Sequence, residues 1–150
     1  MVSERTQMAT VSMQNVPCIS FTVDVMPVPQ ARPRFYVKQH GFKHFVGAYD
    51  PERCKRFKEV IAWHAKIKAV EFGLKDPLKG AISISLTFQM GRNGKEVMHT
   101  KKPDLDNLAK AVKDALKGII YQDDSQIVEA HLYKRYGVPL IKISISEVKK

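Results

Sequence analysis

The sequence contains few cysteines. Cys18 and Cys54 are the two present among 150 residues, they are far apart in the chain, and neither belongs to a C-x-x-C pair. This pattern excludes a disulfide framework and a zinc ribbon, and it favours a reducing cytoplasm. A chain of this length buries roughly two-thirds of its unfolded surface, so it folds without such crosslinks.

Long apolar runs are also missing. No stretch approaches the ~20 apolar residues of a membrane span, so we expect no membrane partner. Residues 1–17 mix polar side chains with isolated apolar ones and lack the continuous apolar core of a signal peptide. We expect them to form a flexible tail ahead of a single domain at residues 18–150.

Acidic residues are outnumbered. Fifteen Asp and Glu oppose 25 Lys and Arg, for a formal net charge of +10. Such an excess favours a polyanionic partner, because each neutralised phosphate releases condensed counterions. Nucleic acid is the leading candidate, with ribosome association and simple solubility as alternatives.

Alternation of apolar and polar residues predicts four strands, at residues 19–25, 82–90, 128–133 and 141–145. The last two strands follow each other closely and are predicted to pair as a hairpin. Residues 30–48 are predicted to form either a short hairpin or an irregular basic loop.

Two helices are predicted between these strands. The first runs from Pro51 to Phe72, with Asp50 as its N-cap and Gly73 as its end. The second covers residues 106–118. The apolar face of the first helix is expected to comprise Phe57, Val60, Ile61 and Ala65, with Trp63 as a further candidate. The order of elements indicates an α/β (α+β) fold: a single domain with a mixed sheet and two main helices on one side.

Acidic residues gather around the second predicted helix. They are Asp104, Asp106, Asp114, Asp123 and Asp124, and Lys110 follows Asp106 by one helical turn. If the fold returns the last two aspartates toward the start of the helix, the carboxylates converge, and a hard cation such as Mg²⁺ relieves their repulsion. The simpler alternatives are a helix N-cap for Asp106, a solvated turn for Asp123 and Asp124, and a salt-bridge role for Lys110.

The run DLDNLAKAVKDALKG, followed by YQDDSQI and then by KRYG, resembles the signature of the RusA family of Holliday-junction resolvases. Upstream, PVPQARPR and YDPERCKRFK resemble phage-type members of that family. The similarity extends over residues 19–147. It departs from some members before the DLD motif, where an unbroken arginine run is replaced by HTKKP.

The resemblance implies a homodimeric, Mg²⁺-dependent endonuclease, with Mn²⁺ as a substitute, that resolves four-way DNA junctions by paired nicks during recombination and repair. It implies that Asp104, Asp106 and Asp124 are catalytic, metal-binding carboxylates. Lys110 corresponds to a helix lysine of the family, and Asp123 to an adjacent aspartate that is an additional metal ligand. We expect the dimer to form through an apolar sheet face that the helices leave uncovered.

The basic residues expected to contact DNA are Arg32 and Arg34, which flank a proline, and Lys101 and Lys102 in the loop before the acidic motif. A guanidinium group binds phosphate through two hydrogen bonds. The competing hypothesis is a non-catalytic basic module that binds nucleic acid or the ribosome. A DxD-type nucleotide-sugar transferase is disfavoured, because the chain is short and has no evident nucleotide-binding subdomain.

Overall fold

The computed structural model describes residues 18–31, 34–41, 43–49, 51–92 and 94–149. Its elements, in chain order, are β1 (Cys18–Val23), β2 (Arg34–His40), β3 (Lys43–Tyr49), α2 (Glu52–Phe72), β4 (Ile82–Gly91), α3 (Leu105–Leu116), the 3₁₀ helix η1 (Asp124–Gln126), β5 (Ile127–Arg135) and β6 (Gly137–Glu147). The tail predicted at residues 1–17 lies outside the described residues.

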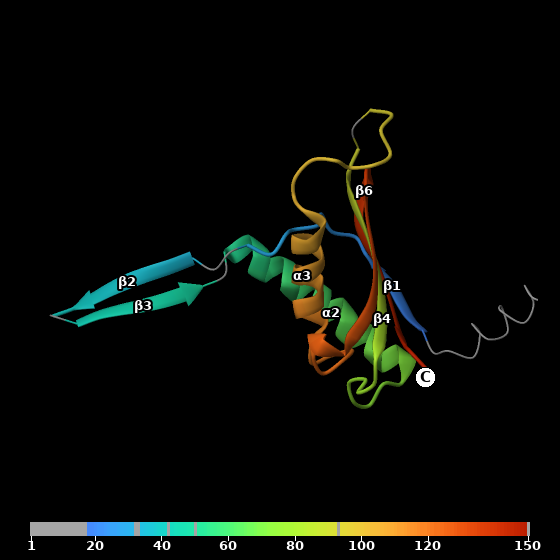
Figure 1. The fold of residues 1–150 in the computed structure, drawn as a ribbon, viewed down its shortest axis with the longest axis horizontal. Helices are drawn as coiled ribbons and strands as arrows, with labels where there is room; N and C mark the ends of the chain where they lie inside the picture. The colour runs from blue at the N-terminus through green and yellow to red at the C-terminus, as the bar shows by residue number, and fades with distance from the viewer. Residues whose placement is uncertain (1–17, 32–33, 42, 50, 93, 150) are drawn as a thin grey trace, which may run out of the picture.

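The main sheet has four strands in the order β1-β6-β4-β5. β6 is antiparallel to both of its neighbours, and β4 is parallel to β5. Two helices, α2 and α3, complete the domain (Figure 1). The predicted α+β fold with a mixed sheet and two main helices is therefore confirmed.

The predicted hairpin of the last two strands is wrong, because β4 lies between β5 and β6. β4, α3 and β5 form a β-α-β crossover, which places β5 parallel to β4 along one of its edges. β6 occupies the other edge. The chain passes the end of β4 at Gly137, where an added Cβ would lie 2.8 Å from Oε1 of Gln89. Glycine permits this close approach.

Alternation along the strands divides the sheet into an apolar and a polar face. The apolar side chains of β4, Ile82, Ile84, Leu86 and Phe88, are buried in the core with residues of both helices. The opposite face carries Ser83, Ser85 and Thr87 of β4, Ser144 of β6 and His131 of β5. The expected apolar, uncovered sheet face is therefore wrong, since the strands use their apolar residues on the helix-covered side.

α2 confirms the predicted end of the first helix. Gly73 adopts a left-handed conformation with φ of 81°, and its N–H bonds to the carbonyls of Ala69 and Val70. The expected cap, Asp50, lies outside the described residues. Two residues assigned to the apolar face are exposed instead: Trp63 is 61% exposed and Val60 is 36% exposed. The buried residues of α2 are Cys54, Phe57, Ile61, Ala65 and Ala69, spaced by three or four residues.

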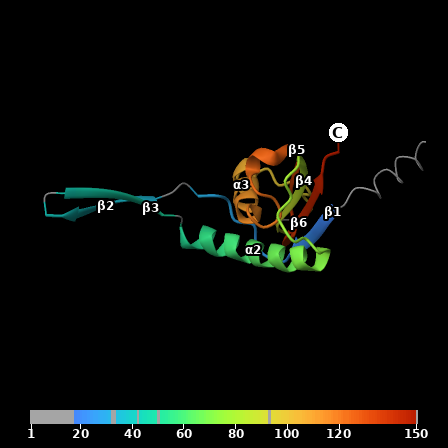
Figure 2. The ribbon, with the colours of Figure 1, turned by 90° about the horizontal axis from the view of Figure 1, so that it is seen from below.

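β2 and β3 pair as a separate two-stranded antiparallel sheet. This confirms the hairpin alternative for residues 30–48. The hairpin projects away from the main sheet beyond the start of α2 (Figures 1 and 2).

Candidate active site

The acidic motif forms the start of α3. Leu108, Ala111, Val112, Ala115 and Leu116 are among its buried residues, so the remaining face is left to polar side chains. The helix begins one residue earlier than predicted, with the extended Asp104 at the N-cap and Asp106 in the first turn. The N-cap alternative for Asp106 is therefore wrong. The side chain of Asp104 makes no capping hydrogen bond, although it occupies the capping position.

A cleft of about 490 Å³ opens beside this helix start. Its charged and polar lining consists of Asp104 and Asn107 from the acidic motif, Lys102 from the preceding loop, Arg53 from α2, and Gln30. Its remaining walls are apolar: Met26, Pro27, Pro29, Met90 and Pro103. The cleft thus combines a carboxylate with two cations, a set suited to a phosphate group and its counterion.

The wall formed by Gln30 is fixed to both helices. The backbone N–H of Gln30 donates to the backbone carbonyl of Asn107 in α3 at 2.9 Å. The Sγ of Cys54 in α2 donates to Oε1 of Gln30 at 3.9 Å. These contacts hold the segment after β1 against the two helices and thereby shape one side of the cleft.

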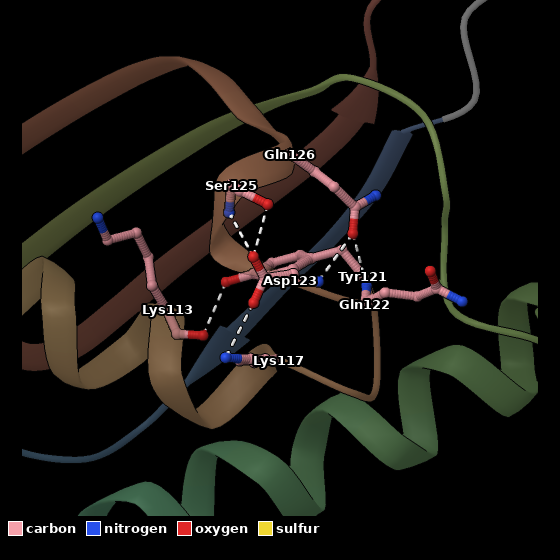
Figure 3. A network of polar contacts seen from close by, with 7 residues as sticks. All are labelled: Lys113, Lys117, Tyr121, Gln122, Asp123, Ser125 and Gln126. Atoms are coloured by element: carbon pink, nitrogen blue, oxygen red, sulfur yellow. Dashed lines mark hydrogen bonds and ion pairs between the residues drawn. The ribbon is translucent and has the colours of Figure 1, made fainter.

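Asp123 lies at the opposite end of α3, in a compact polar network (Figure 3). Its Oδ1 is 2.9 Å from Nζ of Lys117, and its Oδ2 accepts hydrogen bonds from the backbone and side chain of Ser125. The Ser125 hydrogen bonds and then Lys117 hold the pKa of Asp123 well below its usual range. The hydrogen bond to Asp123 in turn raises the pKa of Lys117. Both carboxylate oxygens of Asp123 are thus engaged.

Asp124 is half-buried beside this network. Its Oδ1 is buried without a hydrogen-bond partner among the described residues. The nearby hydroxyl of Tyr121 donates to the carbonyl of Lys113 at 2.7 Å. Burial raises the pKa of Tyr121, and the negative charges of Asp124 and Asp114 raise it further. Asp114 itself pairs with Lys58, with 3.7 Å between Oδ2 and Nζ.

The five aspartates therefore occupy two places rather than one. Asp104 and Asp106 lie at the start of α3, whereas Asp114, Asp123 and Asp124 lie toward its end, a separation of up to about 18 Å for a twelve-residue helix. Within the described ranges, no three His, Cys, Asp or Glu side chains form a group able to hold a metal ion.

The expected return of Asp123 and Asp124 to the helix start does not occur, and strand pairing explains why. β5 runs parallel to β4 with Ile127 opposite Ile82, so both strands begin at the same end of the sheet. The residues just before β5 must therefore lie at that end, which is also where α3 ends.

The expected DNA-binding residues are only partly described. Lys101 and Lys102 are exposed in the loop before α3. Arg32 lies outside the described residues, as does the side chain of Arg34. Lys110 is exposed. The alternative role for Lys110, a salt bridge with Asp106 or Asp114, is not seen among the described residues, where Asp114 pairs with Lys58.

Sequence reasoning missed Arg53, Asn107 and Gln30 as lining residues of the cleft. Asn107 lies within the recognised motif, and Arg53 lies in the helix-start segment YDPERCKRFK. Their position within these two segments was the one sequence feature that could have identified them as lining residues. It was insufficient for Arg53, because basic residues occur all around α2 and the sequence does not show which of them faces α3.

Comparison with known proteins defines the class of this domain. The family model described as endodeoxyribonuclease RusA matches residues 24–146. The chain belongs to the RusA family of endodeoxyribonucleases, which confirms the resemblance and implies a DNA substrate. It is also 34% identical over 142 residues to the uncharacterized protein YqaN of Bacillus subtilis (strain 168), a match covering 87% of this chain and 97% of that relative.

Among the described residues, no helix is long and apolar enough to cross a membrane.

Proposed function

We propose that this protein is a Mg²⁺-dependent endonuclease that resolves four-way DNA junctions by paired nicks in opposing strands, in recombination and repair. Family membership supports the nuclease chemistry. The observation that carries the proposal is the cleft, where Asp104 lies with Arg53 and Lys102. A phosphodiester carries one negative charge, and these groups suit both the phosphate and the cation that accompanies it.

The proposed metal ligands are Asp104, which lines the cleft, and Asp106, which lies in the first turn of α3 and is not part of the cleft lining. Mg²⁺ is usually held by one or two carboxylates together with waters and substrate phosphate oxygens, so a closed set of protein ligands is not required. The residues fit this role, because Asp104 makes no capping hydrogen bond and both side chains are exposed. A bound Mg²⁺, or Mn²⁺ in its place, would neutralise the phosphate and lower the pKa of a water molecule.

The basic residues act on the DNA backbone in this proposal. Arg53 and Lys102, on different walls of the cleft, bind phosphate oxygens and orient the strand. Lys110 is exposed one turn after Asp106 and stabilises negative charge on the reacting phosphate. Lys101, Arg32 and Arg34 contribute further backbone contacts.

Asp124 is proposed as the third catalytic carboxylate, on the basis of the family motif and its unpartnered Oδ1. Asp123 is the weaker metal ligand, because Lys117 and Ser125 engage its oxygens. Since α3 separates Asp124 from Asp104 within one chain, a loss of cutting on substitution of Asp124 must be accompanied by a metal-binding measurement to identify its cause.

A homodimer matches the two-fold symmetry of a junction that is cut twice. The surface we propose for it is an exposed apolar stripe on α2, formed by Val60, Trp63, Ile67 and Val70. Their spacing of three, four and three residues is that of a helix-pairing seam, which a second copy of the same helix complements. The uncovered face of the sheet is polar and is unsuited to this role.

The test is incubation of the protein with a labelled four-way junction, first with Mg²⁺ and then with excess EDTA. We expect paired cuts with Mg²⁺, retention without cutting in EDTA, and little cutting of a linear duplex of the same sequence. Mixed dimers of wild-type and Asp106→Asn chains should nick one strand only. Retention of the junction without cutting at any Mg²⁺ or Mn²⁺ concentration would favour the non-catalytic binding module.

A further inference from the structure

The family-like segment KRYG at the end of β5 contains a lysine whose contacts are directed at the loop that leads into the active-site cleft. The Nζ of Lys134 donates to the carbonyl of Lys101 and to the carbonyl of Pro103, both at 2.7 Å. One ammonium group therefore hydrogen-bonds to the backbone on both sides of Lys102.

The same loop is attached to β5 by its backbone. The N–H of Tyr136 donates to the carbonyl of Val97 at 2.9 Å, and Met98 forms an antiparallel bridge with Arg135. β5 is the edge strand of the sheet, so the loop lies along an edge that is otherwise unpaired. These contacts end before Lys101, and from there the side chain of Lys134 provides the attachment.

The local chemistry explains why a side chain is needed here. Pro103 has no N–H, so the turn has one backbone donor fewer with which to satisfy its own carbonyls. An ammonium group has three donors and forms strong, charge-assisted hydrogen bonds. Lys134 is half-buried and lies on the same face of β5 as Leu132, which directs its side chain toward the helices.

The two carbonyls that accept from Lys134, those of Lys101 and Pro103, are adjacent in sequence to two residues of the cleft, Lys102 and Asp104. Pro103 stands between these two residues, and its carbonyl carbon is bonded to the nitrogen of Asp104. We propose that Lys134 is a positioning residue, which sets the placement of the Asp104 carboxylate and the Lys102 ammonium relative to α3. This inference rests on the proposed function of the cleft.

The experiment compares three variants with the wild type. Lys134→Met keeps the alkyl stem and removes the ammonium group, Lys134→Arg restores a cationic donor, and Lys142→Met is the matched control. Lys142 is an exposed lysine of β6 on the opposite face of the sheet. All variants lose at most one positive charge, so nonspecific effects on DNA affinity are equal for the two Met variants.

We expect Lys134→Met to raise the Mg²⁺ concentration for half-maximal junction cutting by about ten-fold, as do losses of other residues that orient metal ligands. The rate at saturating Mg²⁺ should fall by about ten-fold or more, because small displacements of reacting groups are costly. Lys134→Arg should recover much of both losses. A merely structural role predicts a lower melting temperature without the shift in Mg²⁺ dependence.

Hydrogen exchange supplies a readout that does not depend on cutting. Amides of residues 97–107 should exchange roughly ten-fold faster in Lys134→Met than in Lys142→Met, while those of residues 108–116 stay protected. Equal exchange and equal Mg²⁺ dependence in the two Met variants would overturn the inference. If the wild type cuts no junction, the proposed function fails, and unchanged exchange at residues 97–107 would then show separately that Lys134 does not hold the loop.

Discussion

At the scale of single residues, Asp104 differs from Asp114 and Asp123, the two aspartates near the end of α3 that have ion-pair partners among the described residues. Asp114 pairs with Lys58, and Asp123 pairs with Lys117. Asp104 makes no capping hydrogen bond and faces the cleft. Its carboxylate therefore lies beside Arg53 and Lys102 without a capping hydrogen bond, which leaves its oxygens available to a cation.

Asp104→Asn and Asp106→Asn are each expected to reduce junction cutting by at least about 100-fold, because an amide keeps the shape of the side chain but not the charge that a cation requires. Junction binding should be unchanged or tighter, since a negative charge near phosphate is removed. Rates are measured with saturating Mg²⁺, and Asp76→Asn, at an exposed turn position, is the control. Full activity of both variants would refute the metal-site assignment.

The same series assigns the roles of the adjacent pair. Asp124→Asn is expected to abolish cutting, and Asp123→Asn to have a milder effect. Melting temperature and Mn²⁺ affinity are measured alongside, because both residues belong to the polar region at the end of α3. Loss at Asp123 with full activity at Asp124 would mean that the two roles are reversed.

Arg53 and Lys102 are expected to act through phosphate. Arg53→Gln or Lys102→Gln should weaken junction binding and make the log–log salt dependence shallower by up to about one unit, since each removes one phosphate contact. The control is Arg56→Gln on the next turn of α2, where the arginine pairs with Glu52 at 3.2 Å. An unchanged slope would place the substituted side chain away from DNA.

At the scale of elements, Gln126 connects the end of the crossover to the start of β4. Its Oε1 accepts from the backbone N–H groups of Gln122 and Asp123, and its Nε2 donates to the carbonyls of Leu78 and Gly80 (Figure 3 shows the first pair). One side chain therefore satisfies four backbone groups from two segments.

Gln126→Ala should lower the free energy of unfolding by about 2 kcal/mol, because several partly buried hydrogen bonds are lost together. That corresponds to a fall in melting temperature of roughly 4–8 °C for a domain of this size. Thermal unfolding followed by circular dichroism measures it. Gln122→Ala is the control, since only the backbone of Gln122 takes part, and an equal fall in both variants would contradict this role of Gln126.

At the scale of the whole molecule, the proposed α2 stripe predicts a dimer in sedimentation velocity. Trp63→Glu should yield monomers, because it places a charge in the apolar seam. Val128→Glu, at an equally exposed valine on β5, should leave the dimer intact. A monomeric wild type, or a Trp63→Glu variant that remains dimeric, would reject this interface.

Removal of residues 1–15 is expected to change the melting temperature and junction cutting little. The segment lacks the apolar alternation of the strand that follows it. The truncated and full-length chains are compared by thermal unfolding and by the junction assay. A large fall in melting temperature would show that this segment packs on the domain.

The sequence by itself determined the strands, the helices and the family. Alternation at residues 82–90 predicts β4, and Gly73 predicts the end of α2, because both signals are local. The motif DLDN identified the helix start that lines the cleft. These features depend on residues close together in the chain.

Only the tertiary structure decided which of these residues meet. It separated Asp124 from Asp104. Because β4 and β5 are parallel, both strands begin at the same end of the sheet, and Asp124 lies at that end, just before β5. The tertiary structure placed Trp63 outside the core and Arg53 in the cleft, because the side of α2 that contacts α3 and β1 is the side that becomes buried. It also joined Lys134 to Pro103 across 31 residues. Strand order and helix packing depend on contacts between residues far apart in the chain, so no local sequence pattern predicts them.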